Sequence, residues 1–318
     1  MIGDLRTLIL SIAPLLLTFM LVTIGHGLIG TGTAIRLDLD GFTTNDIGMV
    51  GAAYAVGFML GTLVIPKIIG RVGHIRVFAA FACLFLVSAL VQSLYISVLA
   101  WAALRFAAGF CIAGIFTLTE GWINESTSNA MRGQVLSIYV TVNYFGVTMG
   151  QGLIAVIDPA SVLLFITAAI LISISVVPLS LANIQAPTPV QTERFKIKRL
   201  FQVSPLGCFA VFASGILNSI LANFLPVWGR QIDPTNSFIA IVMLIFVISG
   251  FLCQYPAGKL SDMIDRRFVL IGAASTLLIS GIAGLILPAD VKWVALTLIF
   301  AVGALIPVFY SVGIAHTT

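Results

Sequence analysis

Long apolar runs separated by short polar segments form the pattern of this chain. A helix that crosses about 30 Å of hydrocarbon needs about 20 mostly apolar residues, and ten runs fit that template. The predicted spans are 8–30, 47–69, 77–96, 97–119, 135–157, 161–182, 205–227, 238–257, 268–287 and 292–314. The pattern therefore predicts an all-α membrane protein with ten transmembrane helices.

Composition favours lipid over water as the solvent of this chain. Of the 318 residues, 59% are hydrophobic and 9% are charged, which is too little charge to cover a soluble surface. The net charge of +4 does not indicate a nucleic-acid partner, because the basic residues fall in short loops and not on one polar face. The lipid bilayer is the expected partner.

Metal-binding and cofactor chemistry find little support in the sequence. The four cysteines, Cys83, Cys111, Cys208 and Cys253, lie inside apolar runs without Cys-x-x-Cys spacing, as packing residues do. The three histidines are dispersed, and no nucleotide-binding or hydrolase motif occurs. We expect no metal site, no cofactor and no enzymatic activity, with an integral-membrane lipid enzyme as a distant alternative.

The distribution of basic residues predicts the orientation in the membrane. With a cytoplasmic N-terminus, the inside segments hold 12 lysines and arginines, whereas the outside segments hold three, Arg36, Arg230 and Lys292. Because positive residues stay on the cytoplasmic side, this bias predicts that both termini are cytoplasmic. Arg105 is left over inside a predicted helix.

The segment 183–204 is a long polar stretch among the apolar runs. Its Ala-Pro-Thr-Pro sequence and basic end are typical of a cytoplasmic linker. We expect it to join a six-helix bundle, 1–182, to a four-helix bundle, 205–318.

A charged segment between the eighth and ninth predicted spans resembles motif A of the major facilitator superfamily. The residues that carry this resemblance are Gly258, Asp262, Arg266 and Arg267. A degenerate first copy holds Gly61, Arg71, Gly73 and Arg76, with Ile65 at the place expected for the acid. The segments 71–78, 120–124 and 132–139 are similar to one bacterial branch, the YcaD-like inner-membrane facilitators. The resemblance implies that both motif A segments are charged loops that latch one conformational state.

Facilitators consist of two six-helix halves, so equivalent positions in the two halves should be separated by one constant offset. Pro205 against Leu8 and Gly258 against Gly61 give the same offset, 205 − 8 = 258 − 61 = 197. The shared offset predicts parallel duplication and places Thr318 at the end of the fourth helix of a repeat. We therefore expect a chain truncated after its tenth helix, with six plus four of an expected six plus six helices. A natural ten-helix variant is the alternative.

Arg105 begins the sequence Arg105-x-x-x-Gly109-x-x-x-Ala113-Gly114. It resembles motif B of the family, whose arginine has been linked to proton transfer. The alternative is an arginine that extends to the headgroups or bonds a neighbouring carbonyl. Proton coupling would need a titrating group, and Glu120 and His26 are the candidates, although a Glu120–Arg132 ion pair or a backbone cap and a packed histidine are the plainer interpretations.

The resemblance implies that the first, fourth, seventh and tenth helices line a central cavity, with a contribution from the fifth. The polar side chains on these helices are the substrate candidates, together with Arg105: Thr23, His26, Glu120, Asn143, Tyr144, Gln151, Asn218, Asn223 and Tyr310. This lining suits a neutral or weakly polar solute better than a multiply charged one, but interhelical hydrogen bonds would explain many of these residues equally well. Gln151 also stands where antiporters of the family carry a proline, which argues weakly against drug–proton antiport.

Together these features predict a secondary active transporter that moves a small solute across the bacterial inner membrane by alternating access. Proton coupling and a monomeric state are part of this expectation, and truncation is expected to remove the activity. A membrane receptor or scaffold without transport is the main alternative.

Overall fold

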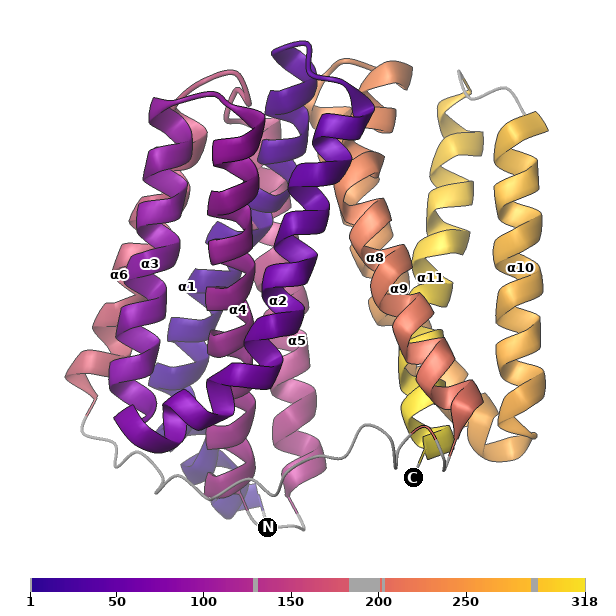
Figure 1. Cartoon of the computed structure of the whole chain (residues 1–318). Helices are drawn as coiled ribbons and strands as arrows, with labels where there is room; N and C mark the ends of the chain where they lie inside the picture. The colour runs from indigo at the N-terminus through magenta and orange to yellow at the C-terminus, as the bar shows by residue number, and fades with distance from the viewer. Residues whose placement is uncertain (1, 128–130, 183–200, 202–203, 287–290, 318) are drawn as a thin grey trace. The chain divides into compact units, whose positions relative to one another are not determined.

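The computed structural model describes residues 2–127, 131–182, 201, 204–286 and 291–317. Within these ranges the chain forms long α-helices and no β-strand (Figure 1). The long helices are α1 (Ile2–Leu39), α2 (Thr44–Val72), α3 (His74–Leu94), α4 (Val98–Ser126), α5 (Arg132–Gly152), α6 (Leu163–Leu181), α8 (Pro205–Ile232), α9 (Asn236–Met263), α10 (Arg266–Ile286) and α11 (Lys292–Thr317), and a 3-10 turn, η1 (Leu153–Ala155), follows α5. In this part of the chain, all of these long helices except α5 are apolar and long enough to cross a membrane.

Each predicted span corresponds to one of these helices, but most helices extend beyond the predicted boundaries. The α1 helix continues nine residues past the predicted end at Gly30, to Leu39. The apolar pattern marks only the hydrocarbon-embedded portion of a helix, whereas backbone hydrogen bonds carry the helix onward into the polar interface.

The predicted motif A loop between α9 and α10 is almost entirely helical, so that prediction was wrong in its secondary structure. Only Ile264 and Asp265 separate the two helices. The Asp265 carboxylate accepts a hydrogen bond from the Arg267 backbone N–H at 2.9 Å, which caps the start of α10. A side-chain cap of this kind allows a very short connection, and hydropathy does not reveal it.

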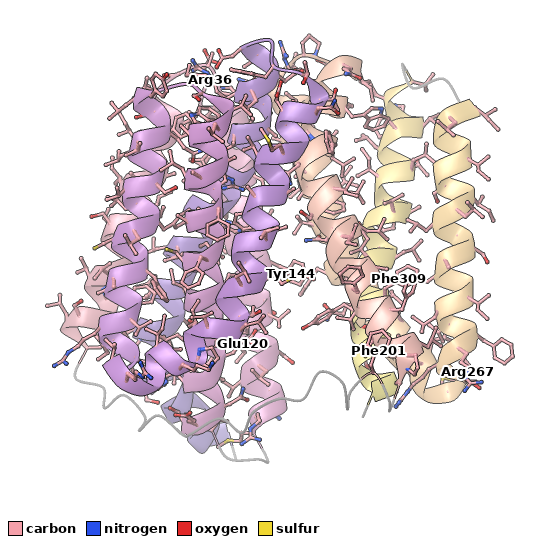
Figure 2. All side chains as sticks on the ribbon, viewed as in Figure 1. Arg36, Glu120, Tyr144, Phe201, Arg267 and Phe309 are labelled. Atoms are coloured by element: carbon pink, nitrogen blue, oxygen red, sulfur yellow. The ribbon has the colours of Figure 1, made fainter. Side chains whose placement is uncertain are left out.

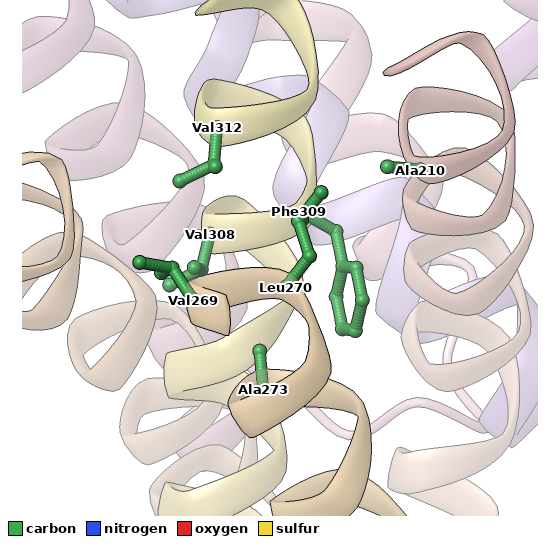
Figure 3. Close-up of a cluster of buried hydrophobic side chains, with 7 residues drawn as sticks. All are labelled: Ala210, Val269, Leu270, Ala273, Val308, Phe309 and Val312. Carbon is green, nitrogen blue, oxygen red and sulfur yellow. The ribbon is translucent and has the colours of Figure 1, made fainter. Parts of the chain in front are cut away.

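The chain divides into two compact units, Met1–Glu193 and Arg194–Thr318. In the first unit, α2 packs along α4, and α1 packs against both α5 and α6. In the second unit, α11 packs against α8, α9 and α10. A cluster of buried side chains fills the junction of α8, α10 and α11 (Figure 3): Ala210, Val269, Leu270, Ala273, Val308, Phe309 and Val312.

Two glycines bring α2 and α4 unusually close. A Cβ atom added to Gly57 would lie 2.0 Å from the Phe106 carbonyl oxygen, and one added to Gly109 would lie 2.1 Å from the Tyr54 carbonyl oxygen. No side chain fits at either position, so each backbone rests directly on the other. Small residues at helix contacts are a common basis of packing in membranes.

The helix boundaries also correct the internal repeat. Helices α2 and α9 start 236 − 44 = 192 residues apart, and helices α3 and α10 start 266 − 74 = 192 residues apart. The offset of 197 was therefore wrong by five residues, which is more than one helical turn. Its Gly61 marker lies within α2, where an added Cβ would be 2.7 Å from the Ala113 Cβ, so this glycine is needed for helix packing. With the corrected offset, the counterpart of Asp262 is Gly70 (262 − 192), not Ile65.

We predict that Gly109→Ala lowers the free energy of unfolding by about 1–3 kcal/mol, because the methyl group must push the two backbones apart. Gly121→Ala is the matched control on the same helix, since nothing lies within 4 Å of its added Cβ. The control should change stability by no more than about 1 kcal/mol. Denaturation of both variants in detergent micelles measures the difference, and equal stabilities would contradict the close-packing account.

Candidate functional site

Arg105 lies inside the first unit. It belongs to α4, is 3% exposed, and its Cζ atom lies 4.5 Å from the centroid of the Tyr54 ring. Its Nε and Nη1 atoms have no hydrogen-bond partner. A charge placed in a membrane helix costs at least about 2.5–3.5 kcal/mol, and a desolvated cation–π contact returns about 2 kcal/mol. The arginine therefore packs against protein and does not extend to the headgroups.

Tyr54 joins Arg105 to His26. Its hydroxyl lies 3.4 Å from His26 Nε2, and the two rings stack with centroids 5.6 Å apart. Helices α1, α2 and α4 thus bring together His26 and Arg105, which the sequence analysis proposed, and Tyr54, which it missed. The available signal was a hydroxyl-bearing ring in an apolar helix, one turn before Phe58, because such a hydroxyl usually needs a partner.

An aromatic ladder continues from this point. We define it as Tyr54, Phe58, Phe116, Phe19 and Tyr139, whose successive ring centroids lie 6.3, 6.2, 5.0 and 4.7 Å apart. The ladder draws on α1, α2, α4 and α5, so four helices contribute to one continuous row of rings.

Glu120 lies at the far end of the ladder, near the C-terminus of α4 (Figure 2). The Tyr139 hydroxyl donates a hydrogen bond to Glu120 Oε1 at 3.1 Å. The plainer interpretation, an ion pair of Glu120 with Arg132 or a backbone cap, is not what the structure shows, because Arg132 donates to the Asn124 carbonyl at 3.3 Å. Arg105 and Glu120 are 15 residues apart on one helix, about 22 Å along its axis, and therefore cannot pair.

Helix α5 is more polar than its neighbours and is the long helix that falls short of the membrane-span composition. Gln134, Ser137 and Thr141 are exposed on it. The Oδ1 atom of Asn143 and the Oε1 atom of the buried Gln151 have no hydrogen-bond partner. The Ser137 and Thr141 hydroxyls donate to the backbone one turn earlier. The exposed Gln134 side chain and the unpartnered amide oxygens are poorly suited to lipid, so α5 requires water or protein beside it.

The remaining substrate candidates have varied positions. Thr23 is buried between α1 and α5, where its hydroxyl donates to the Met20 carbonyl at 2.9 Å. Tyr144 is partly exposed on α5 (Figure 2). In the second unit, Asn218 and Tyr310 are exposed. Asn223 donates to the Ser219 carbonyl at 2.7 Å. The packing of Thr23 and the backbone bond of Asn223 are the structural roles that the sequence left open.

Most motif A residues lie at the two short helix connections, whereas Gly61 lies within α2 and Gly258 and Asp262 lie within α9. Arg71 and Arg76 are exposed on either side of Gly73, whose φ of 90° favours glycine. In the second copy Arg267 is exposed and Arg266 is partly buried. Of Gly258 and Asp262, the structure describes the helical backbone but not the Asp262 side chain.

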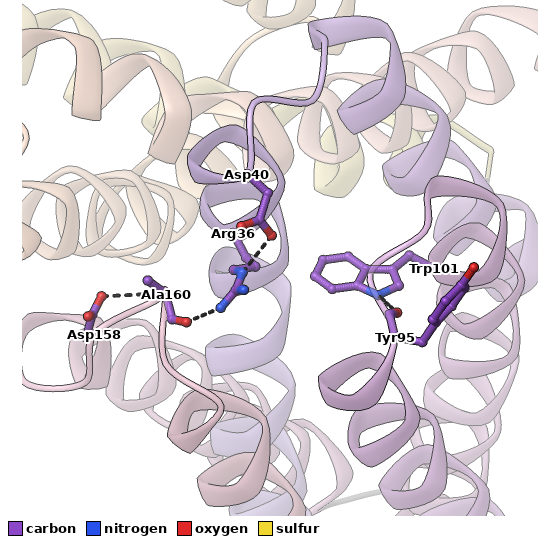
Figure 4. A network of polar contacts seen from close by, with 6 residues as sticks. All are labelled: Arg36, Asp40, Tyr95, Trp101, Asp158 and Ala160. Atoms are coloured by element: carbon purple, nitrogen blue, oxygen red, sulfur yellow. Dashed lines mark hydrogen bonds and ion pairs between the residues drawn. The ribbon is translucent and has the colours of Figure 1, made fainter.

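In each unit, polar contacts also join helix ends that lie away from the motif A connections. Arg36 bonds Asp40 at 2.7 Å and also donates to the Ala160 carbonyl, which ties α1 to the segment before α6 (Figure 4). In the second unit, Asp233 after α8 pairs with Lys292 at the start of α11. The Lys292 hydrogen bond, aided by Thr235, lowers the pKa of Asp233 to about 2. Both are exposed anchors and suggest no chemistry.

The comparisons with known proteins agree with this architecture. The family model of the Major Facilitator Superfamily matches residues 9–318. The chain belongs to this superfamily. In the facilitator, no group of three or more His, Cys, Asp and Glu side chains within the described ranges could hold a metal ion.

Several proteins are similar to this facilitator over most of its length. An uncharacterized MFS-type transporter of Enterobacter sp. (strain 638) is 28% identical over 260 residues, which cover 80% of this chain and 68% of the relative. YcaD, an uncharacterized MFS-type transporter of Escherichia coli O45:K1 (strain S88 / ExPEC), is 29% identical over 261 residues, with the same coverage of 80% and 68%.

Two solved transporters share the fold. The nucleoside transporter NupG superposes with a TM-score of 0.75 at 13% identity and covers 96% of this chain and 80% of its own. The D-xylose–proton symporter gives 0.72 at 16% identity, with 94% and 80% covered. These likenesses, the helices and the family model together place the chain among membrane transporters.

We predict that Tyr54→Leu lowers the free energy of unfolding by about 1–2 kcal/mol, because Arg105 loses the π face over which it packs. Tyr54→Phe keeps that face, so it should remain within about 0.5 kcal/mol of the wild-type protein. Denaturation in detergent micelles measures both. A Phe variant as unstable as the Leu variant would show that the hydroxyl, and not the ring, matters at this position.

Proposed function

We propose that this facilitator is a secondary active transporter that moves a small organic solute across the bacterial inner membrane by alternating access. The observation that carries the proposal is the aromatic ladder, which runs between Arg105 and Glu120 inside one membrane unit. Ionisable residues within membrane helices are expensive and usually mark a path for a solute or an ion. Aromatic rings with a few polar groups are typical of small-molecule sites.

Alternating access assigns separate roles to the two halves of the chain. We propose that 1–182 and 205–318 act as bundles joined by the cytoplasmic linker 183–204 and rock about a midplane site. The charged motif A connections around Arg71 and Arg267 would latch one state. The excess of basic residues in the predicted inside loops supports cytoplasmic termini. We propose a monomer as the working unit.

The solute is the least constrained part of the proposal. The uncharged polar residues on α5 and α8 favour a weakly polar body without multiple charges. A receptor or scaffold of the same fold would bind such a solute without moving it. Counterflow in proteoliposomes, in which an internal unlabelled solute drives uptake of the labelled one, distinguishes transport from binding alone.

Accessibility of α5 tests whether water reaches the proposed cavity. In a background without the four native cysteines, we expect Thr141→Cys to react with a membrane-impermeant maleimide, because Thr141 is exposed on the polar face of α5 that lines the proposed aqueous path. Val87→Cys is the control, since Val87 is exposed on the apolar α3 helix and faces lipid. Equal labelling of the two positions would overturn the aqueous path.

Glu120 is the proposed proton carrier, because this acid lies at the end of the aromatic ladder and accepts a hydrogen bond from Tyr139 at 3.1 Å. With Glu120→Gln, we expect proton-driven accumulation of a transported solute to fall by on the order of a hundredfold, the lower end of the contribution of one proton-transfer group. Counterflow needs no net proton movement and should stay within about twofold. If accumulation persists in this variant, Glu120 does not couple transport to protons.

A further inference from the structure

The charge of Arg105 is not balanced by any acid that the structure places beside it. The ion pairs of Arg36 with Asp40 and of Lys292 with Asp233 lie at helix ends, away from Arg105. Glu120 lies about 22 Å away along the same helix. What Arg105 does contact is the face of Tyr54, a neutral ring. A buried cation with a neutral partner alone has the electrostatic requirement for an anion.

The groups around Arg105 are donors with open capacity. Two guanidinium nitrogens, Nε and Nη1, are buried and unpartnered, as is Nδ1 of His26. The Tyr54 hydroxyl and His26 Nε2 lie 3.4 Å apart. When the hydroxyl donates to Nε2, the neutral ring carries its proton on Nδ1, which is then the open donor; in the other tautomer Nε2 donates to the hydroxyl oxygen and the hydroxyl proton is open. Arg105 and the Tyr54–His26 pair, which come from three helices, thus present open hydrogen-bond donors. Such a set matches the oxygens of an anion better than a neutral hydroxyl or amide.

Charge balance restricts the anion. One guanidinium and two neutral groups can neutralise one negative charge, whereas a dianion such as a phosphate monoester would leave a net charge buried in the membrane. A guanidinium also binds a carboxylate through two parallel hydrogen bonds. Tyr54 and His26 are partly exposed, whereas Arg105 is 3% exposed. A rotation of the Tyr54 ring would therefore open the route to the guanidinium.

We propose that Arg105, Tyr54 and His26 bind the single carboxylate of the transported solute, and that the aromatic ladder accommodates its apolar or ring-shaped body. This inference rests on the transport function proposed above and narrows its weakly polar solute to a monocarboxylate. The carboxylate takes the place of the Tyr54 ring as the partner of Arg105. An apolar body on the solute accounts for the aromatic rings, and not further cations, that continue from the site.

Matched acids and amides test the site directly. Two pairs of ligands, benzoate with benzamide and phenylacetate with phenylacetamide, are titrated calorimetrically into the full chain in detergent micelles. We expect each acid to bind at least tenfold more tightly than its amide. Arg105→Gln should reduce the ratio of acid to amide affinity to about one, and Arg105→Lys should retain part of the preference for the acid. Arg36→Gln, which removes a cation bound to Asp40 at a helix end, should keep the wild-type ratio.

An acid-to-amide ratio near one in the wild-type protein, or an unchanged ratio in Arg105→Gln, overturns the site. If Arg105→Gln does not fold, the wild-type ratio and the Arg105→Lys variant decide the question. Counterflow of labelled benzoate separates the two proposals. Tight binding without exchange leaves the site standing and rejects transport, whereas exchange of neutral solutes that is indifferent to Arg105→Gln leaves transport standing and rejects the site.

Discussion

The backbone contact between α2 and α4 at Gly109 is the constraint on which the candidate site depends. Gly109 lies one helical turn after Arg105, and its missing side chain lets the Tyr54 carbonyl rest against α4. The same approach places the Tyr54 ring over the guanidinium. A bulkier residue would separate the helices and remove the π face from the charge. Tyr54 therefore takes part in both contacts: its backbone packs on Gly109, and its ring covers the charge of Arg105.

Arg105 and Glu120, two ionisable residues of α4, have different surroundings. Arg105 is enclosed by α1 and α2 and lacks hydrogen-bond partners at two nitrogens. Glu120 is exposed at the other end of the helix and bonded to a tyrosine of α5. A buried charge can respond to a solute group, whereas an exposed acid can exchange protons with water. This separation supports distinct roles for solute recognition and proton movement along one row of aromatic rings.

Hydropathy was sufficient to predict the ten helices and the family, because lipid requires long apolar helices and motif A leaves a charged signature. It could not place the end of α1 or the start of α10, where backbone hydrogen bonds and the Asp265 cap, and not apolar length, determine the boundary. The repeat offset failed because Gly61 is a packing glycine of α2. Arg105 and His26 stood out as polar residues in apolar helices, but Tyr54 was missed because contacts between helices are not visible in one sequence.

The most direct measurement is the nitrogen NMR spectrum of arginine side chains in lipid nanodiscs, with Arg105→Lys used to assign the resonance. A guanidinium held over the Tyr54 ring should show a ring-current-shifted Nε–H that exchanges slowly with water, and Tyr54→Leu should abolish that shift. If the spectrum contains only unshifted, rapidly exchanging Nε–H signals, Arg105 is not held in the interior of the first unit, and the account of the site fails.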